Sequence, residues 1–112
     1  MSMQQHPVVV WSDASGAHTA ALLGDLTARG LMDDTLVVWT TEFGRTAFSQ
    51  GGTGRDHNGG CFVTWLAGAG IRGGTAHGSS DNLGHKAAEG VTWCYDLHAT
   101  ILHLMGIDHQ RL

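Results

Sequence analysis

The sequence has little positive charge, a single proline and no long apolar run. Its 112 residues include six Lys and Arg against ten Asp and Glu, which gives a formal net charge of −4. Because a protein that binds a phosphate backbone needs a basic surface, this balance disfavours nucleic-acid binding. No apolar stretch approaches the roughly 20 residues of a membrane-spanning helix, and no export signal is visible at the N-terminus. We therefore expect neither a nucleic-acid partner nor a membrane span, and the sequence indicates no compartment.

Cysteine is also scarce. Cys61 and Cys94 both lie in predicted sheet segments, and two buried free thiols are favoured over a disulfide. The 17 Gly residues indicate many tight backbone positions rather than a proline-rich linker. The length allows at most one small domain, and an apolar fraction of 42% is enough for a core. Eight His residues are many for this length and favour metal or proton chemistry.

The central element of the predicted fold is an apolar strand at residues 35–41. Its run LVVW at residues 36–39 is rich in β-branched and aromatic side chains, which is typical of a buried strand. The pattern before it predicts a short strand at Pro7–Trp11 and a helix from His18 to Arg29, with Gly30 just past the helix end. Strand, helix and strand in this order predict a βαβ unit with a right-handed crossover.

A second buried strand is predicted at Cys61–Leu66, followed by a glycine-rich turn at residues 68–74 and little regular structure at residues 75–90. Asp96 is expected to cap a helix that runs through Met105. The core stripe of that helix consists of Leu97, Ile101 and Leu104. The long glycine-rich loop after the central strand runs from Glu42 to Gly60. An unstructured loop of this length is usually functional or disordered.

The best candidate site combines Glu42, at the end of the central strand, with Asp56 and His57 from that loop. A divalent metal such as Zn, Mn, Mg or Ca takes carboxylate oxygens and imidazole nitrogens that converge from separate backbone segments. In open α/β sheets, ligands bind outside the carboxyl ends of the strands. These three residues are therefore the predicted metal ligands. The structural alternative is that Glu42 pairs with Arg45 or Arg55, Asp56 caps the loop and His57 is a polar loop residue.

The predicted site also contains residues suited to an anionic substrate. A guanidinium fork matches phosphate, sulfate or carboxylate, so Arg45 and Arg55 are candidates, together with Asn58. Ion pairs from the two arginines to Glu42 and Asp56 are an equally good interpretation, and both can hold at once.

Other arrangements of reactive residues are poorly supported. His98 and His103 lie about 140° apart around a helix and cannot form a helical two-histidine metal motif, which favours surface or packing roles. The remaining isolated loop histidines are His77, His85 and His109. No Ser-His-Asp arrangement is present, and we identify no catalytic nucleophile.

Four ordered blocks of the chain resemble the C-terminal part of a bacterial sulfatase-like family that is abundant in planctomycetes. The family is catalogued as a domain of unknown function, family 1501. The blocks are LMDDTLVVW followed by EFGRT (residues 31–46), GRDHN (residues 54–58), LAGAGIRGG (residues 66–74) and DLHATILHLMGI (residues 96–107). The resemblance covers roughly residues 16–112, which we treat as the C-terminal part of a sulfatase-like α/β domain, and leaves residues 1–15 as a poorly matched N-terminal segment.

This family looks like a branch of the alkaline phosphatase superfamily. The resemblance implies part of an α/β/α sandwich with a mostly parallel sheet, incomplete in this chain, and one or two divalent metals at the strand ends. In the superfamily, such a strand usually ends in Asp followed by His or Asn, both of them metal ligands. Here Glu42 and Phe43 take these positions, so one ligand is replaced by an apolar ring. His57 resembles the later metal-binding histidine.

The resemblance also implies a function. Family members are several times longer, and their nucleophile and first metal carboxylates lie in a part that is absent here. We therefore expect a C-terminal fragment of a metal-dependent sulfatase- or phosphatase-like hydrolase of small-molecule or glycan esters, inactive on its own. The alternative is a non-catalytic, degenerate hydrolase-fold binding module or a fragment without independent function. Sheet edges exposed by truncation would favour self-association.

Overall fold

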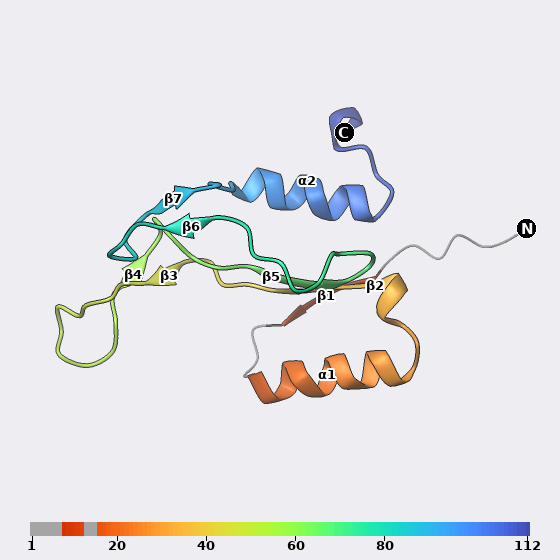
Figure 1. Cartoon of the computed structure of the whole chain (residues 1–112), viewed down its shortest axis with the longest axis horizontal. Helices are drawn as coiled ribbons and strands as arrows, with labels where there is room; N and C mark the ends of the chain where they lie inside the picture. Colours follow the sequence, from red (N-terminus) through yellow and green to blue (C-terminus); the bar gives the residue numbers. More distant parts are fainter. Residues whose placement is uncertain (1–7, 13–15) are drawn as a thin grey trace, which may run out of the picture.

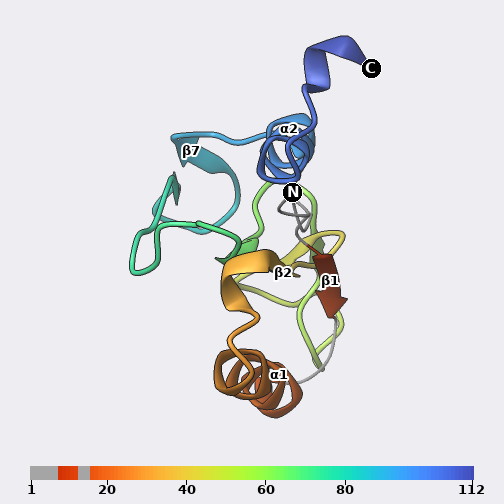
Figure 2. The same cartoon turned by 90° about the vertical axis from the view of Figure 1, so that its right-hand side faces the viewer.

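A computed structural model describes residues 8–12 and 16–112, with one helix on each side of a central sheet (Figures 1 and 2). None of the helices in this part of the chain is both long and apolar enough to span a membrane. The elements are β1 (Val8–Ser12), α1 (Gly16–Ala28), the 3-10 helix η1 (Met32–Asp34), β2 (Thr35–Trp39), β3 (Gly44–Arg45), β4 (His57–Asn58), β5 (Trp65–Gly68), β6 (Ser79–Ser80), β7 (Ala87–Glu89), α2 (Cys94–Leu104) and the 3-10 helix η2 (His109–Arg111).

The central sheet has the strand order β1-β2-β5, with β2 in the middle. β1 runs parallel to β2, with Val10 opposite Val37. β5 runs antiparallel to β2, with Leu66 opposite Val38. The remaining strands form two separate antiparallel ribbons, β3 with β4 and β6 with β7.

This topology shows that the predicted fold class, an α/β/α sandwich with a mostly parallel sheet, is wrong. Among the described strands the parallel pairing is confined to β1 and β2, and the other pairings are antiparallel. The chain is a small mixed α/β domain. The physical reason lies in residues 40–64, which contain a short antiparallel ribbon and no helix. A parallel neighbour normally needs a helical crossover, and without one β5 returns against β2.

The core lies between β2 and α2. Leu36 and Val38 are fully buried and pack with Ile101 of α2, and Leu66, Leu97 and Leu104 lie partly buried around them. The stripe predicted for the C-terminal helix is thereby confirmed. Successive side chains of a strand point to opposite faces, so Val37 faces away from α2. It is also fully buried, on the side of the sheet where α1 lies (Figure 2).

The second predicted strand lies further along the chain than its apolar pattern suggested. β5 begins at Trp65, while Phe62 and Val63 are exposed and precede it. Gly68, the last residue of β5, pairs with Leu36 and fixes where β5 lies along β2. Its φ is +82°, and a Cβ there would collide with the carbonyl oxygen of Thr35. This close backbone approach requires glycine.

The other predicted elements are confirmed with small shifts. α1 ends at Ala28, and Gly30 has a φ of +68°, as expected for a glycine just past a helix end. α2 begins at Cys94, two residues before Asp96. Asp96 is therefore not the residue before the helix, as predicted, but its third residue; Trp93 holds the N-cap position, and its backbone N–H donates to Asp96 Oδ2 at 2.8 Å.

Because Ile101 joins α2 to the buried strand, Ile101→Ala should leave a cavity in the core. We expect the free energy of unfolding to fall by about 2–4 kcal/mol. Urea denaturation followed by far-UV circular dichroism measures this change. Tyr95→Ala is the matched control on the same helix, since Tyr95 is 79% exposed, and it should change stability by less than about 0.5 kcal/mol. Equal losses for the two variants would contradict this account of the core.

Candidate functional site

The predicted site residues lie on the β3–β4 ribbon or next to it in the chain, just beyond the end of β2. The chain turns out of β2 with the help of Thr41, whose hydroxyl donates to the carbonyl oxygen of Phe43 at 2.6 Å. In the ribbon, Gly44 pairs with Asn58 and Arg45 pairs with His57. The structure thus brings together Arg45 and His57, two candidate residues from separate segments. This pairing has no signal in the sequence, because each strand is two residues long.

An aromatic stack joins three side chains of this ribbon. The rings of Phe43 and His57 are stacked, with centroids 3.9 Å apart and an interplanar angle of 25°. The Arg45 Cζ atom lies 5.6 Å from the centroid of the Phe43 ring. Phe43 therefore has a contact role that the sequence analysis missed. The spacing of two residues between Phe43 and Arg45, which is that of side chains on one face of an extended segment, is the signal that could have indicated it.

The ion pairs of the structural alternative are not formed. Among the described residues, an ion pair joins Asp25 of α1 to Arg29, just past the helix end, with an N–O distance of 2.9 Å. Arg45 Nη1 instead donates to the carbonyl oxygen of Arg55 at 3.0 Å. Each arginine holds backbone in this way, since Arg55 Nη1 donates to the carbonyl oxygen of Thr46 at 3.3 Å.

Asp56 takes the loop-capping role of that alternative. Its Oδ2 atom accepts a hydrogen bond from the backbone N–H of Gln50 at 3.3 Å. Its own carbonyl oxygen accepts from the N–H of the buried Thr46 at 2.9 Å, which continues the β3–β4 pairing by one step. The Asp56 side chain is thus turned into the loop at residues 46–56.

Asn58 connects the ribbon to the next loop. Its Nδ2 atom donates to the carbonyl oxygen of Gly84 at 3.1 Å, and its Oδ1 atom accepts from the N–H of Gly60 at 2.9 Å. Phe48 and His85 add an edge-to-face ring contact between the same two regions, with centroids 5.2 Å apart. The carboxamide of Asn58 therefore holds two loops together, and its role toward an anion stays a prediction.

The donor chemistry of Glu42, Asp56 and His57 suits a divalent metal, but their arrangement does not make a closed site. No three His, Cys, Asp or Glu side chains gather as a ligand set in residues 8–12 and 16–112. The Asp56 carboxylate faces Gln50, while the His57 ring lies on Phe43. Glu42 is exposed and has no hydrogen-bond partner in the described part of the chain. The metal-ligand roles of these three residues therefore stay predictions.

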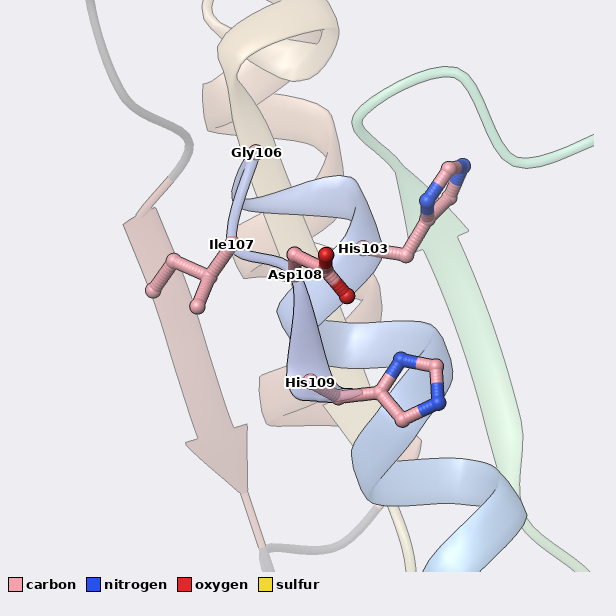
Figure 3. A pocket seen from close by; sticks show the side chains of 5 residues that line it. All are labelled: His103, Gly106, Ile107, Asp108 and His109. Carbon is pink, nitrogen blue, oxygen red and sulfur yellow. The ribbon is translucent and has the colours of Figure 1, made fainter. Parts of the chain in front are cut away.

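A separate hollow of about 350 Å³ lies near the C-terminus, at the opposite end of the molecule from the ribbon (Figures 1 and 3). It is lined by His103, Gly106, Ile107, Asp108 and His109. The turn at Gly106, with a φ of +76°, brings the two histidines to one hollow, which their positions in the sequence did not suggest. Asp108 Oδ1 accepts from the N–H of Gln110 at 3.0 Å and caps η2.

Asp81 holds the loop that Asn58 contacts. The backbone N–H of His85 donates to its Oδ1 atom at 2.8 Å. This hydrogen bond is the main reason why the pKa of Asp81 lies below its ordinary value, because it stabilises the charged carboxylate. The loop is further closed by the N–H of Asp81, which donates to the carbonyl oxygen of Lys86 at 2.9 Å.

The ribbon depends on the absence of a side chain at Gly44. A Cβ at this position would collide with the carbonyl oxygen of Cys61, and neither backbone segment can yield without moving the ribbon. In Gly44→Ala we therefore expect the Thr46 amide to lose roughly tenfold or more of its protection from hydrogen exchange. Gly51→Ala is the control in the same loop, since a Cβ there meets nothing within 4 Å. Equal protection of Thr46 in the two variants would disprove this packing constraint.

The lowered pKa of Asp81 also predicts a pH dependence. A carboxyl group whose pKa is lower in the folded state stabilises that state above its unfolded pKa of about 4. This contribution is lost as the pH falls through the lower, folded pKa. The His85 amide proton resonance should follow this transition in NMR spectra recorded below about pH 4. Asp81→Asn keeps an acceptor oxygen without a titrating proton and should abolish the transition; a transition that persists in this variant would refute the assignment.

Comparison with known proteins gives one result. The family model described as "Protein of unknown function (DUF1501)" matches residues 5–112 of the chain. No curated protein and no solved structure matches it. The matched region contains the central sheet, the β3–β4 ribbon and both helices. The chain therefore belongs to the DUF1501 family of proteins of unknown function.

Proposed function

We propose that this chain is the C-terminal part of a metal-dependent hydrolase of sulfate or phosphate esters. The observation that supports this most is the pairing of Arg45 with His57 on a ribbon that directly follows the buried strand β2. Arg45, a cation suited to an anion, and His57, a side chain of a type that binds metals, are thereby neighbours. Glu42 lies between that strand and the ribbon.

The available groups suit a part of such a site. In the described part of the chain, neither ring nitrogen of His57 has a hydrogen-bond partner, and the Glu42 carboxylate has none either. Arg45 donates one N–H, from Nη1, to the carbonyl oxygen of Arg55. The other N–H groups of its guanidinium remain available to an anion. When bound, a divalent ion supplies Lewis-acid polarisation of an ester oxygen or a more acidic water. Because no nucleophile accompanies these residues, we expect no ester turnover from this chain alone.

In this proposal Glu42, Asp56 and His57 supply metal ligands from this chain, and Arg45, Arg55 and Asn58 serve the anionic group of a small-molecule or glycan ester. Asp56 would have to release the Gln50 amide to contribute its second oxygen. That hydrogen bond is 3.3 Å long and lies in an exposed loop, so its loss costs little.

The second candidate function is a non-catalytic module that binds an anionic partner. Phe43 favours it, because an apolar ring stands where the superfamily resemblance implies a second metal ligand, and this ring is stacked on His57. Turnover of aryl sulfate and aryl phosphate esters by the parent protein would separate a hydrolase from a binder.

Self-association is a further proposal, since β1 and β5 are the outer strands of the central sheet and Trp65 of β5 is exposed. Light scattering would detect it.

The metal is tested by measuring the content of Zn, Mn, Mg and Ca after incubation and dialysis. We expect bound metal in the unmodified chain and a drop of roughly tenfold or more in affinity for Glu42→Ala and His57→Ala, because each removes a ligand. His98→Ala is the matched control, since His98 is an exposed histidine of α2. Absence of bound metal in the unmodified chain, or an equal effect of His98→Ala, would rule out the metal site.

A further inference from the structure

Phe43 contacts both neighbouring groups of the candidate site at once. Its ring is stacked on the imidazole of His57, 3.9 Å between centroids, and lies 5.6 Å below the guanidinium carbon of Arg45. Phe43 is half-buried, whereas Arg45 and His57 are exposed. One apolar ring thus supports two polar side chains that extend into solvent.

These contacts restrict the conformations of both polar groups. Stacking limits the tilt of the His57 ring, and the attraction between a cation and an aromatic face limits the position of Arg45. A third constraint acts on Arg45, because its Nη1 atom donates to the carbonyl oxygen of Arg55 at 3.0 Å. Long exposed side chains normally lose rotamer entropy when they bind a ligand, and such restriction reduces that loss.

The groups that remain available are hydrogen-bond donors. Arg45 keeps its Nε–H and its Nη2 hydrogens, and the His57 ring has no hydrogen-bond partner among the described residues. The carboxylate of Asp56, next to His57 in the chain, accepts a hydrogen bond from the Gln50 amide. A tetrahedral oxyanion offers several acceptor oxygens to two such donors, and a guanidinium fork fits its geometry.

We propose that Phe43 is a positioning residue that holds Arg45 and His57 ready to bind one tetrahedral oxyanion, the sulfate or phosphate group of a monoester. This rests on the proposed function in its assignment of Arg45 to an anion. It goes beyond that function by giving Phe43 a role and by making His57 a second hydrogen-bond donor to the same oxyanion.

The experiment titrates sodium sulfate and sodium phosphate, in separate arms at pH 7, into protein treated with EDTA. NMR spectra follow the Arg45 Nε–H and the His57 ring resonances. Arg45→Gln should abolish the shifts. Phe43→Leu, which removes the ring and keeps an apolar side chain, should weaken binding about tenfold and remove the ring-current shift of His57. Phe43→Tyr keeps the ring and should bind like the unmodified chain.

Phe48→Leu is the matched control. It removes the edge-on contact with His85 in the neighbouring loop and should leave binding unchanged. The Thr46 amide reports whether the ribbon remains paired in each variant. Binding lost in Phe43→Leu and restored in Phe43→Tyr, with the ribbon intact, supports the proposal. Unchanged binding in Phe43→Leu, no binding of either anion, or shifts away from Arg45 and His57 would overturn it.

The outcome is separable from that of the metal experiment. Because EDTA removes divalent ions, any anion binding measured in this experiment takes place without a metal. Anion binding without any metal site would leave Phe43 as a positioning residue of a binding module. Metal binding without anion binding would be consistent with the hydrolase proposal but would contradict the positioning role of Phe43.

Discussion

The burial of β2 is the constraint on which the rest of the structure depends. Leu36, Val37 and Val38 are fully buried, so this one strand supplies apolar side chains to both faces of the sheet. Its two neighbours satisfy its backbone hydrogen bonds, and Ile101 of α2 covers one face. The strand also determines where the candidate site lies, because only a short turn separates the end of β2 at Trp39 from the start of β3 at Gly44. A hydrogen bond of 2.8 Å between the hydroxyls of Thr40 and Thr64 joins the chain as it leaves β2 to the chain as it enters β5.

The ribbon beyond β2 is stabilised in a different way. Its side chains are mostly exposed, so hydrophobic burial contributes little there, and its order comes from backbone contacts and hydrogen bonds. Arg45 and Arg55 each bind a backbone carbonyl of the facing segment, and Asn58 ties the ribbon to the loop at residues 81–86. The candidate site on this ribbon therefore combines accessible polar groups with a defined arrangement, which binding sites in general require.

The sequence predicted the elements whose signals are local. The apolar run of β2, the stripe of α2 and the glycines after both helices depend on residues within one or two turns of one another. The direction of β5 was missed, because it depends on how residues 40–64 return and on a backbone contact at Gly68. In the candidate site, the sequence predicted roles for Arg45 and His57 separately, but their pairing requires a register that two-residue strands do not encode. The contact of Phe43 with His57, and the position of His103 and His109 at one hollow, likewise arise from turns and pairing rather than from periodicity.

The base of the β3–β4 ribbon has a consequence for how this protein family can vary. Register is set where Gly44 meets Cys61 and where Thr46 pairs with Asp56. The tip between Phe48 and Arg55 adds the long hydrogen bond from the Gln50 N–H to the Asp56 carboxylate, at 3.3 Å. Doubling the length of a flexible loop costs only about 0.6 kcal/mol of closure entropy. Insertions or deletions at this tip can therefore reshape the rim of the site while Arg45 and His57 stay in place. The fold thus separates the part of the site that must be conserved in geometry from the part that can diversify.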